Sequence, residues 1–94
     1  MAKKTGMLQV EVVTRTKRMW HGLASSVIVP SVDGDLGILV DRAPILAVLR
    51  PGNVVLETAN EGHQEIEVSA GFASVDSNFV TIVVDSGDFI TSSK

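Results

Sequence analysis

The sequence predicts an all-β protein, a sandwich or a barrel, on three observations. Valine, isoleucine and threonine make up 27 of the 94 residues, and these stiff, branched side chains suit a pleated sheet better than a helix. Apolar and polar residues alternate with a period of two in several segments, which is typical of half-buried strands. Turn signals recur about every 8–12 residues without a helical pattern between them, as in sandwiches and barrels.

The first half of the chain is predicted to hold three strands and one ambiguous segment. Pro30 is expected to end the second strand, because proline donates no hydrogen bond to a ladder. Asp33-Gly34 is a strong turn pair, and residues 41–44 form a second corner. The strands are Leu8–Val13, Leu23–Val29 and Leu36–Val40, and Ile45–Leu49 is either a strand or half a helix.

The second half is predicted to hold four strands. Pro51-Gly52 reads as a turn with a positive φ at Gly52, and residues 60–63 as the tip of a hairpin. Gly71 interrupts a strand pattern, which indicates a bulge or a close backbone approach. Residues 76–78 form a turn, and the polar segment 86–94 is expected to be a frayed tail. The strands are Asn53–Thr58, Glu65–Ala70, Phe72–Val75 and Phe79–Val84.

Length and composition exclude several classes of protein. A chain of 94 residues with 45% hydrophobic residues is one ordered domain rather than a disordered segment. The absence of cysteine excludes disulfides, cysteine-ligated metal sites and a cysteine nucleophile. The longest apolar run, Ile45–Leu49, is too short to cross a membrane, and no secretory signal is visible. We therefore expect a soluble protein that meets a membrane only through partners.

Charge is distributed unevenly along the chain. Residues 1–18 carry five basic groups and one acidic group, whereas the remaining 76 residues carry three basic and ten acidic groups. A basic arm could bind nucleic acid, but these basic groups are split by a predicted strand. Trp20 is the only aromatic residue near them, and single-strand binders present several stacking aromatics. We expect no nucleic-acid partner.

Residue patterns typical of catalytic and metal sites are missing. His21 and His63 lie far apart without cysteine, unlike the clustered ligands of structural zinc. We expect His63 to be solvated at a hairpin tip and His21 to be packed or on the surface. Residues 33–35 and 85–88 resemble fragments of a calcium loop but lack its flanking helices. Neither a phosphate-binding loop nor a Gly-x-Ser-x-Gly elbow occurs, although residue types alone leave a Ser-His-Asp triad open. No catalytic residue, metal ligand or cofactor is assigned.

Apolar residues crowd a turn-rich stretch between residues 34 and 52. A domain of this size cannot easily bury all of them, and an exposed apolar patch often marks a partner surface. The alternative is a densely turned sandwich edge. The residues are Ile38, Leu39, Ile45, Leu46, Val48 and Leu49.

In this stretch the sequence resembles the epsilon subunit of rotary ATP synthases, called delta in mitochondria. The resemblance rests on the order and spacing of several motifs and covers residues 7 to about 88. The motifs are Gly34-Asp35-Leu36-Gly37-Ile38, Ala43-Pro44-Ile45-Leu46, Leu49-Arg50-Pro51-Gly52, Ser69-Ala70-Gly71-Phe72 and Val80-Thr81-Ile82-Val83-Val84, with Leu8-x-Val10 and Gly22-Leu23 upstream.

The resemblance implies a fold, a place and a function. The family's β domain is a flattened barrel of about ten strands in two sheets, here residues 7–88 between a flexible N-terminus (1–6) and a C-terminal tail (89–94). It sits at the foot of the central stalk, packs on the gamma subunit and rests on the membrane c-ring, with no active site or cofactor of its own. That role implies a peripheral location on the cytoplasmic or stromal face of an energy-transducing membrane.

Site residues are carried over by matching position. Gly34, Asp35, Leu36 and Gly37 match the loop that faces the c-ring, and Ala43, Pro44 and Ile45, with Arg42 before them, match the gamma contact. This chain has Asp41-Arg42 where the family often has Gly-His, which alters the polar part of that contact. Family members commonly continue into a helical hairpin. Here either the member is naturally short or the hairpin was removed, so neither inhibition nor nucleotide binding is assigned.

Two other hypotheses remain. A generic β-sandwich adaptor would bind an unrelated protein through the same apolar stretch. A small enzyme or ligand-binding barrel would have a pocket of about 300 Å³ or more together with a strongly perturbed histidine or carboxylate.

Overall fold

The computed structural model describes residues 6–90, which form nine β-strands and no helix. The all-β prediction is confirmed, and the ambiguous segment 45–49 is a strand. The strands are β1 (Leu8–Val13), β2 (Arg18–Ser31), β3 (Gly34–Leu39), β4 (Ile45–Leu49), β5 (Gly52–Thr58), β6 (His63–Val68), β7 (Gly71–Asp76), β8 (Phe79–Val84) and β9 (Gly87–Phe89).

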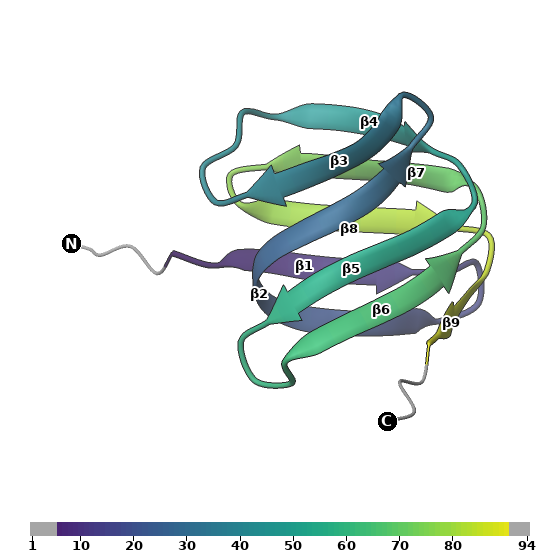
Figure 1. Ribbon diagram of the computed structural model, residues 1–94, viewed down its shortest axis with the longest axis horizontal. Helices are drawn as coiled ribbons and strands as arrows, with labels where there is room; N and C mark the ends of the chain where they lie inside the picture. Colours follow the sequence, from purple (N-terminus) through teal and green to yellow (C-terminus); the bar gives the residue numbers. More distant parts are fainter. Residues whose placement is uncertain (1–5, 91–94) are drawn as a thin grey trace.

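The strands form two layers that share β2 (Figure 1). One layer runs β4-β7-β8-β1 and continues into the first half of β2, which pairs with β1. The second half of β2 pairs with β3 and β5, and this layer continues through β6 to β9. Because the 14-residue β2 serves both layers, each layer has five strand segments. This arrangement agrees with the expected two-sheet sandwich of about ten short strands.

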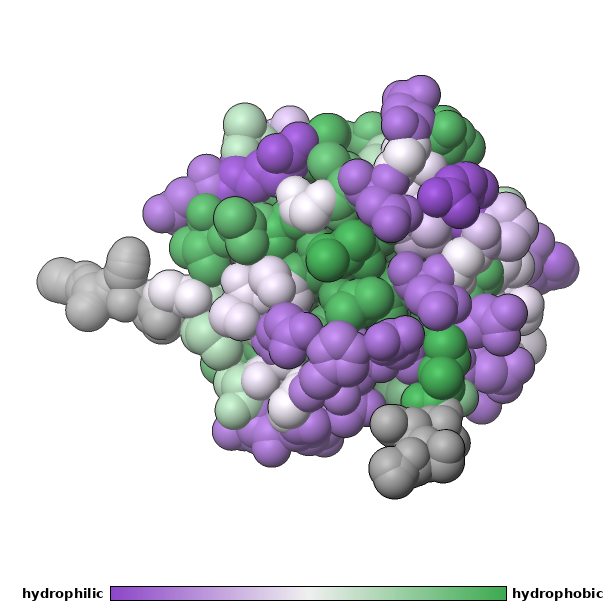
Figure 2. All heavy atoms as spheres, viewed as in Figure 1, coloured by the Kyte–Doolittle hydropathy of each residue, from purple (hydrophilic) through white to green (hydrophobic). Residues whose placement is uncertain are grey.

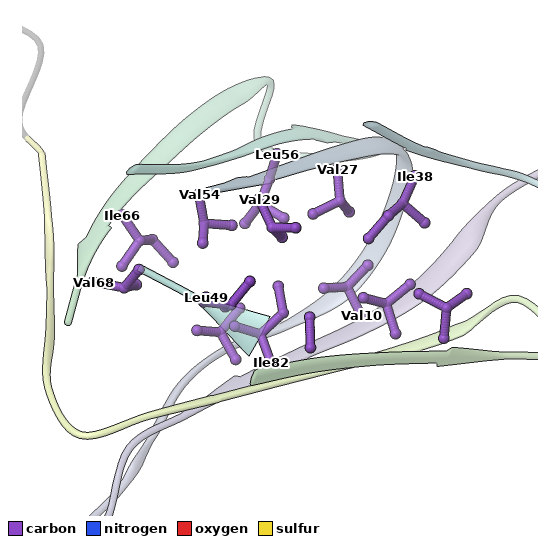
Figure 3. Packing of buried hydrophobic residues seen from close by; sticks show 14 of the residues in the cluster. Val10, Val27, Val29, Ile38, Leu49, Val54, Leu56, Ile66, Val68 and Ile82 are labelled. Carbon is purple, nitrogen blue, oxygen red and sulfur yellow. The ribbon is translucent and has the colours of Figure 1, made fainter. Parts of the chain in front are cut away.

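The core lies between the two layers and is built by alternate residues of nearly every strand (Figure 3). Leu8, Val10 and Val12 of β1 are at most 1% exposed, while Gln9 between them is exposed. The same alternation places residues of the opposite layer against them. The other buried apolar residues are Ala24, Val27, Val29, Ile38, Ala47, Leu49, Val54, Leu56, Ile66, Val68, Ala73, Val75, Val80, Ile82 and Val84.

The expected break at Pro30 is wrong, because β2 continues through it to Ser31. Pro30 is buried and lies opposite Asp35 in the pairing with β3. Ser31 and Gly34 flank the two-residue turn, and the next pair of an antiparallel ladder exchanges no hydrogen bonds. The missing N–H of Pro30 therefore costs nothing towards β3, and its carbonyl oxygen accepts from the Arg50 N–H at 2.9 Å.

Two glycines are required by close packing. A Cβ built on Gly71 would lie 2.0 Å from the Val83 carbonyl oxygen, which confirms the expected close approach. The predicted positive φ at Gly52 is wrong. Gly52 begins β5, and a Cβ there would lie 2.8 Å from Cβ of Pro30. At both positions glycine is needed because part of another strand lies where a Cβ would be, and not because the backbone turns there.

The expected frayed tail is ordered over Gly87–Phe89, which form β9 and pair with β6. The Ile90 N–H continues this contact by donating to the Glu65 carbonyl oxygen at 3.0 Å. Hydrogen-bonded structure thus extends slightly past residue 88, the expected end of the domain. Most of the expected flexible ends, residues 1–5 and 91–94, lies outside the described residues.

Candidate functional site

The four residues expected to face the c-ring lie in a strand rather than a loop. Gly34–Gly37 open β3 directly after the Val32-Asp33 turn. The Gly34 φ of 121° is in the range that favours glycine. The Asp35 side chain is 68% exposed, and its Oδ1 lies 3.2 Å from Nη2 of Arg50. Arg50 also donates through Nε to the Ser31 carbonyl oxygen at 3.2 Å. Arg50 therefore connects the Asp35 carboxylate with the end of β2 in the β2–β3 hairpin.

The four residues expected to face gamma form the corner between β3 and β4. Arg42, Ala43 and Pro44 are exposed, whereas Ile45 is half-buried and packs against the core. This corner therefore offers a short exposed segment that is anchored at its end by an apolar side chain.

An open groove of about 350 Å³ is lined by the β2–β3 hairpin and by β4, and part of each of the two predicted sets lines it. Gly34, Asp35 and Leu36 line one side, and Ile45 lines the other. Gly37 and residues 42–44 do not line it. The two predicted contacts are thus adjacent on one edge of the sandwich.

The apolar stretch is only partly exposed. Ile38 and Leu49 are buried, whereas Leu39, Leu46 and Val48 are 62%, 68% and 58% exposed. Val48 lies beside the exposed Phe72 of β7 in the pairing of β4 with β7. The expected apolar surface therefore exists on the outer side of β4.

The departure at Asp41 is accommodated by Asn78, which lies 37 positions further along the chain and which no sequence motif connects with it. Asp41 has a φ of 67°, a conformation that glycine adopts freely and that other residues adopt at a cost. The Asp41 N–H donates to Oδ1 of Asn78 at 2.6 Å, and Nδ2 of Asn78 donates to the Asp41 carboxylate at 3.0 Å. This reciprocal pair holds the β3–β4 corner against the β7–β8 turn.

Replacing Asn78 with alanine should destabilise the fold by about 1–3 kcal/mol, because two hydrogen bonds are lost and a φ of 65° is left to alanine. Asn78→Gly removes the same hydrogen bonds without the backbone strain and should cost less. Urea denaturation of both variants separates the two contributions. Equal stability of both variants and the parent chain would contradict the role of this pair.

His63 is exposed, as expected for a solvated residue, but it is the first residue of β6 rather than part of the hairpin tip. Its Nδ1 lies 2.6 Å from Oε2 of Glu57, and its Nε2 lies 2.9 Å from Oε2 of Glu65. Hydrogen bonding to Glu65 and then to Glu57 raises the pKa of His63 above 6.5. The protonated ring therefore stabilises the fold below pH 6.5, and this contribution is lost as the pH rises through the folded pKa.

Replacing Glu65 with glutamine should lower the pKa of His63, and more than Glu57→Gln, because the Glu65 hydrogen bond is the larger cause of the shift. Glu67→Gln is the matched control, since the Glu67 carboxylate makes no contact with the ring among the interactions of residues 6–90. The titration is followed by NMR of the His63 ring protons. A drop in the control as large as that in Glu65→Gln would overturn this explanation.

Neither a metal-binding cluster nor a pocket lined by the perturbed histidine is found in the described residues. Within residues 6–90 no group of three or more histidine or acidic residues could hold a metal ion, and His21 is exposed on β2. A second open hollow of about 610 Å³ is lined by residues that include Gln9, Leu23, Asn78, Phe79 and Thr81. His63, whose pKa is raised, lines neither hollow, so a pocket and a perturbed histidine do not coincide.

No helix capable of spanning a membrane occurs between residues 6 and 90.

Comparisons with known proteins agree on one family. The family described as ATP synthase, Delta/Epsilon chain, beta-sandwich domain matches residues 7–88. The chain is 40% identical over 79 residues to the ATP synthase epsilon chain of Micrococcus luteus, covering 84% of this chain and 87% of that one. It is 37% identical over 78 residues to the epsilon chain of Xanthomonas oryzae pv. oryzae, covering 83% of this chain and 56% of that one.

The fold also resembles a solved structure. A chain in the mitochondrial ATP synthase of Euglena gracilis, solved as OSCP/F1/c-ring, superimposes with a TM-score of 0.85 at 16% identity, covering 94% of this chain and 56% of that one. The chain therefore spans little more than half the length of some relatives and nearly all of the Micrococcus protein.

Proposed function

The chain belongs to the ATP synthase delta/epsilon family, and from this premise we propose that it is a non-catalytic subunit of the central stalk of a rotary ATP synthase. It links the gamma subunit to the membrane c-ring and so couples ion translocation to ATP synthesis. The observation that carries this proposal is the family match over residues 7–88, which takes in the sandwich from β1 into β9.

The exposed apolar surface of β4 supports a gamma contact at this edge. Ala43 and Pro44 lead directly into a strand whose Leu46 and Val48 side chains face solvent. Burying such side chains against a partner contributes roughly 25 cal/mol per Å² before the costs of association. We assign gamma binding to Arg42, Ala43, Pro44 and Ile45 and extend it to Leu46 and Val48.

The hairpin end supports a c-ring contact. Gly34–Gly37 present the Asp35 carboxylate, and Arg50 holds it in position. A polar contact at such an exposed rim is worth about 1 kcal/mol or less, so it sets the register of the complex more than its affinity. The protein would thereby lie on the cytoplasmic or stromal face of an energy-transducing membrane, held there by its partners.

Reversing the charge at Asp35 tests this division of surfaces. Asp35→Lys should weaken attachment to the c-ring by about fivefold, corresponding to about 1 kcal/mol, and leave gamma binding within about twofold. Glu67→Lys is the matched control, because it makes the same charge change on β6. Binding of the labelled chain to c-rings in nanodiscs and to gamma gives both affinities. Equal loss of the two would count against separate contacts.

A further inference from the structure

The outer surface of the second layer has an apolar centre that no other segment between residues 6 and 90 covers. Ile28 of β2 lies between Gly37 of β3 and Val55 of β5 in the strand pairing. Ile28 is 40% exposed, Leu39 beside it on β3 is also exposed, and Gly37 leaves open space. Figure 2 shows apolar residues gathered in the middle of this face, over β3, β2 and β5.

Acidic side chains border this centre along β5, β6 and β9. Val55 is paired with Glu65, and Glu67 lies directly opposite Asp88 in the pairing of β6 with β9. Like charges placed opposite each other destabilise a sheet. Among residues 6–90, no lysine or arginine forms an ion pair with any member of this border. Within the described part of the chain, the one ionisable base that contacts this border is His63, which lies between Glu57 and Glu65.

We propose that this face docks a basic amphipathic segment of a protein partner. Its apolar side chains would cover Leu39, Ile28 and Val55, and its lysines or arginines would lie against Glu65, Glu67 and Asp88. Charge complementarity selects this occupant, because an acidic border repels nucleic acid and anionic lipid but attracts a cationic segment. The proposal goes beyond the proposed function, since the gamma contact lies on β4 and its preceding corner and the c-ring contact lies at the hairpin end, where Gly37 alone adjoins Ile28.

The interaction depends on both the apolar centre and the acidic border of this face. Separate rim charges contribute little to affinity but accelerate and orient association, whereas the apolar centre supplies the burial. A dissociation constant of about 10–100 μM is expected for a short peptide, because ordering the segment offsets part of the gain.

The probe is a synthetic helical peptide of about 18 residues with leucines along one face and lysines along its flank. A second peptide has glutamate in place of each lysine. Titration into the isotopically labelled full chain, followed by amide chemical shifts, should perturb β2, β3, β5 and β6 with the lysine peptide only. Perturbations centred on β4, β7 and β8, or similar affinity for both peptides, would overturn the proposal.

Two pairs of variants test the apolar centre and the acidic border separately. Ile28→Gln should lower the affinity of the chain for the lysine peptide by at least about fivefold. Leu46→Gln makes the same kind of uncharged change on the other layer and should leave that affinity within about twofold of the parent chain's. Neutralising Glu67 and Asp88 together should weaken binding by a similar factor at low salt. Neutralising Asp33 and Asp76, which lie in or beside turns elsewhere, should not.

Equal effects within either pair would contradict the assigned face. Circular dichroism confirms that each variant is folded before its affinity is interpreted. Retained gamma binding alongside absent peptide binding would refute this inference alone, and the converse would refute the proposed function alone.

Discussion

Substituting Gly71 with alanine is expected to destabilise the protein by about 3 kcal/mol or more. The added Cβ would lie 2.0 Å from the Val83 carbonyl oxygen and 2.8 Å from the Val84 Cα. These are backbone atoms of the paired strand β8, so they cannot move aside as a flexible side chain would. A loss of this size should lower the melting temperature by more than about 10 °C in so small a domain.

Gly37→Ala is the matched control for that substitution. Gly37 also lies in a strand, but no atom comes within 4 Å of its added Cβ. Its stability should change by no more than about 0.5 kcal/mol. Thermal and urea denaturation followed by circular dichroism gives both values. A Gly71→Ala variant as stable as Gly37→Ala would mean that β7 and β8 do not approach as closely as described.

Replacing Leu46 with glutamine should reduce the affinity for the gamma subunit by about 10- to 100-fold. Leu46 is 68% exposed on β4, and full burial of a leucine side chain contributes about 1.5–3 kcal/mol. Glutamine has a similar size and no charge, so the change removes apolar contact without altering the electrostatic field. Because the side chain points away from the core, the free energy of unfolding should change by less than about 0.5 kcal/mol.

Ile28→Gln is the control for the gamma measurement, because it makes a comparable change on the outer face of the other layer. Its affinity for gamma should stay within about twofold of that of the parent chain. Calorimetric titration of gamma with each variant gives the comparison. Similar losses in both variants would show that β4 is not the specific contact.

The strands could be predicted from the sequence because each buries one face, so that a period of two is visible along the chain. The continuity of β2 could not, because it depends on Pro30 lying at a position where β3 requires no N–H. The ambiguity of Ile45–Leu49 had the same origin. Pairing with β7, and with β2 at Leu49, determines that this short apolar segment is a strand.

The proximity of the candidate residues in space follows from their closeness in the sequence, but the interactions among them could not be predicted. The motifs around Asp35 and Pro44 are neighbours in the sequence, and β3 with the corner that follows it keeps them close; their roles toward the c-ring and gamma stay predictions. The Asp41–Asn78 pair joins residues 37 positions apart, and no local sequence pattern predicts it. The position of His63 between Glu57 and Glu65 depends on the register of β5 with β6, which is fixed only when the hairpin forms.

The most direct test of the central claim is calorimetric binding of the full chain to purified gamma subunit at two salt concentrations and several temperatures. A central-stalk subunit with an apolar contact on β4 should bind tightly, show a negative heat-capacity change and weaken little as salt is raised. Absence of binding at tens of micromolar, or binding that disappears at the higher salt concentration, would contradict this account.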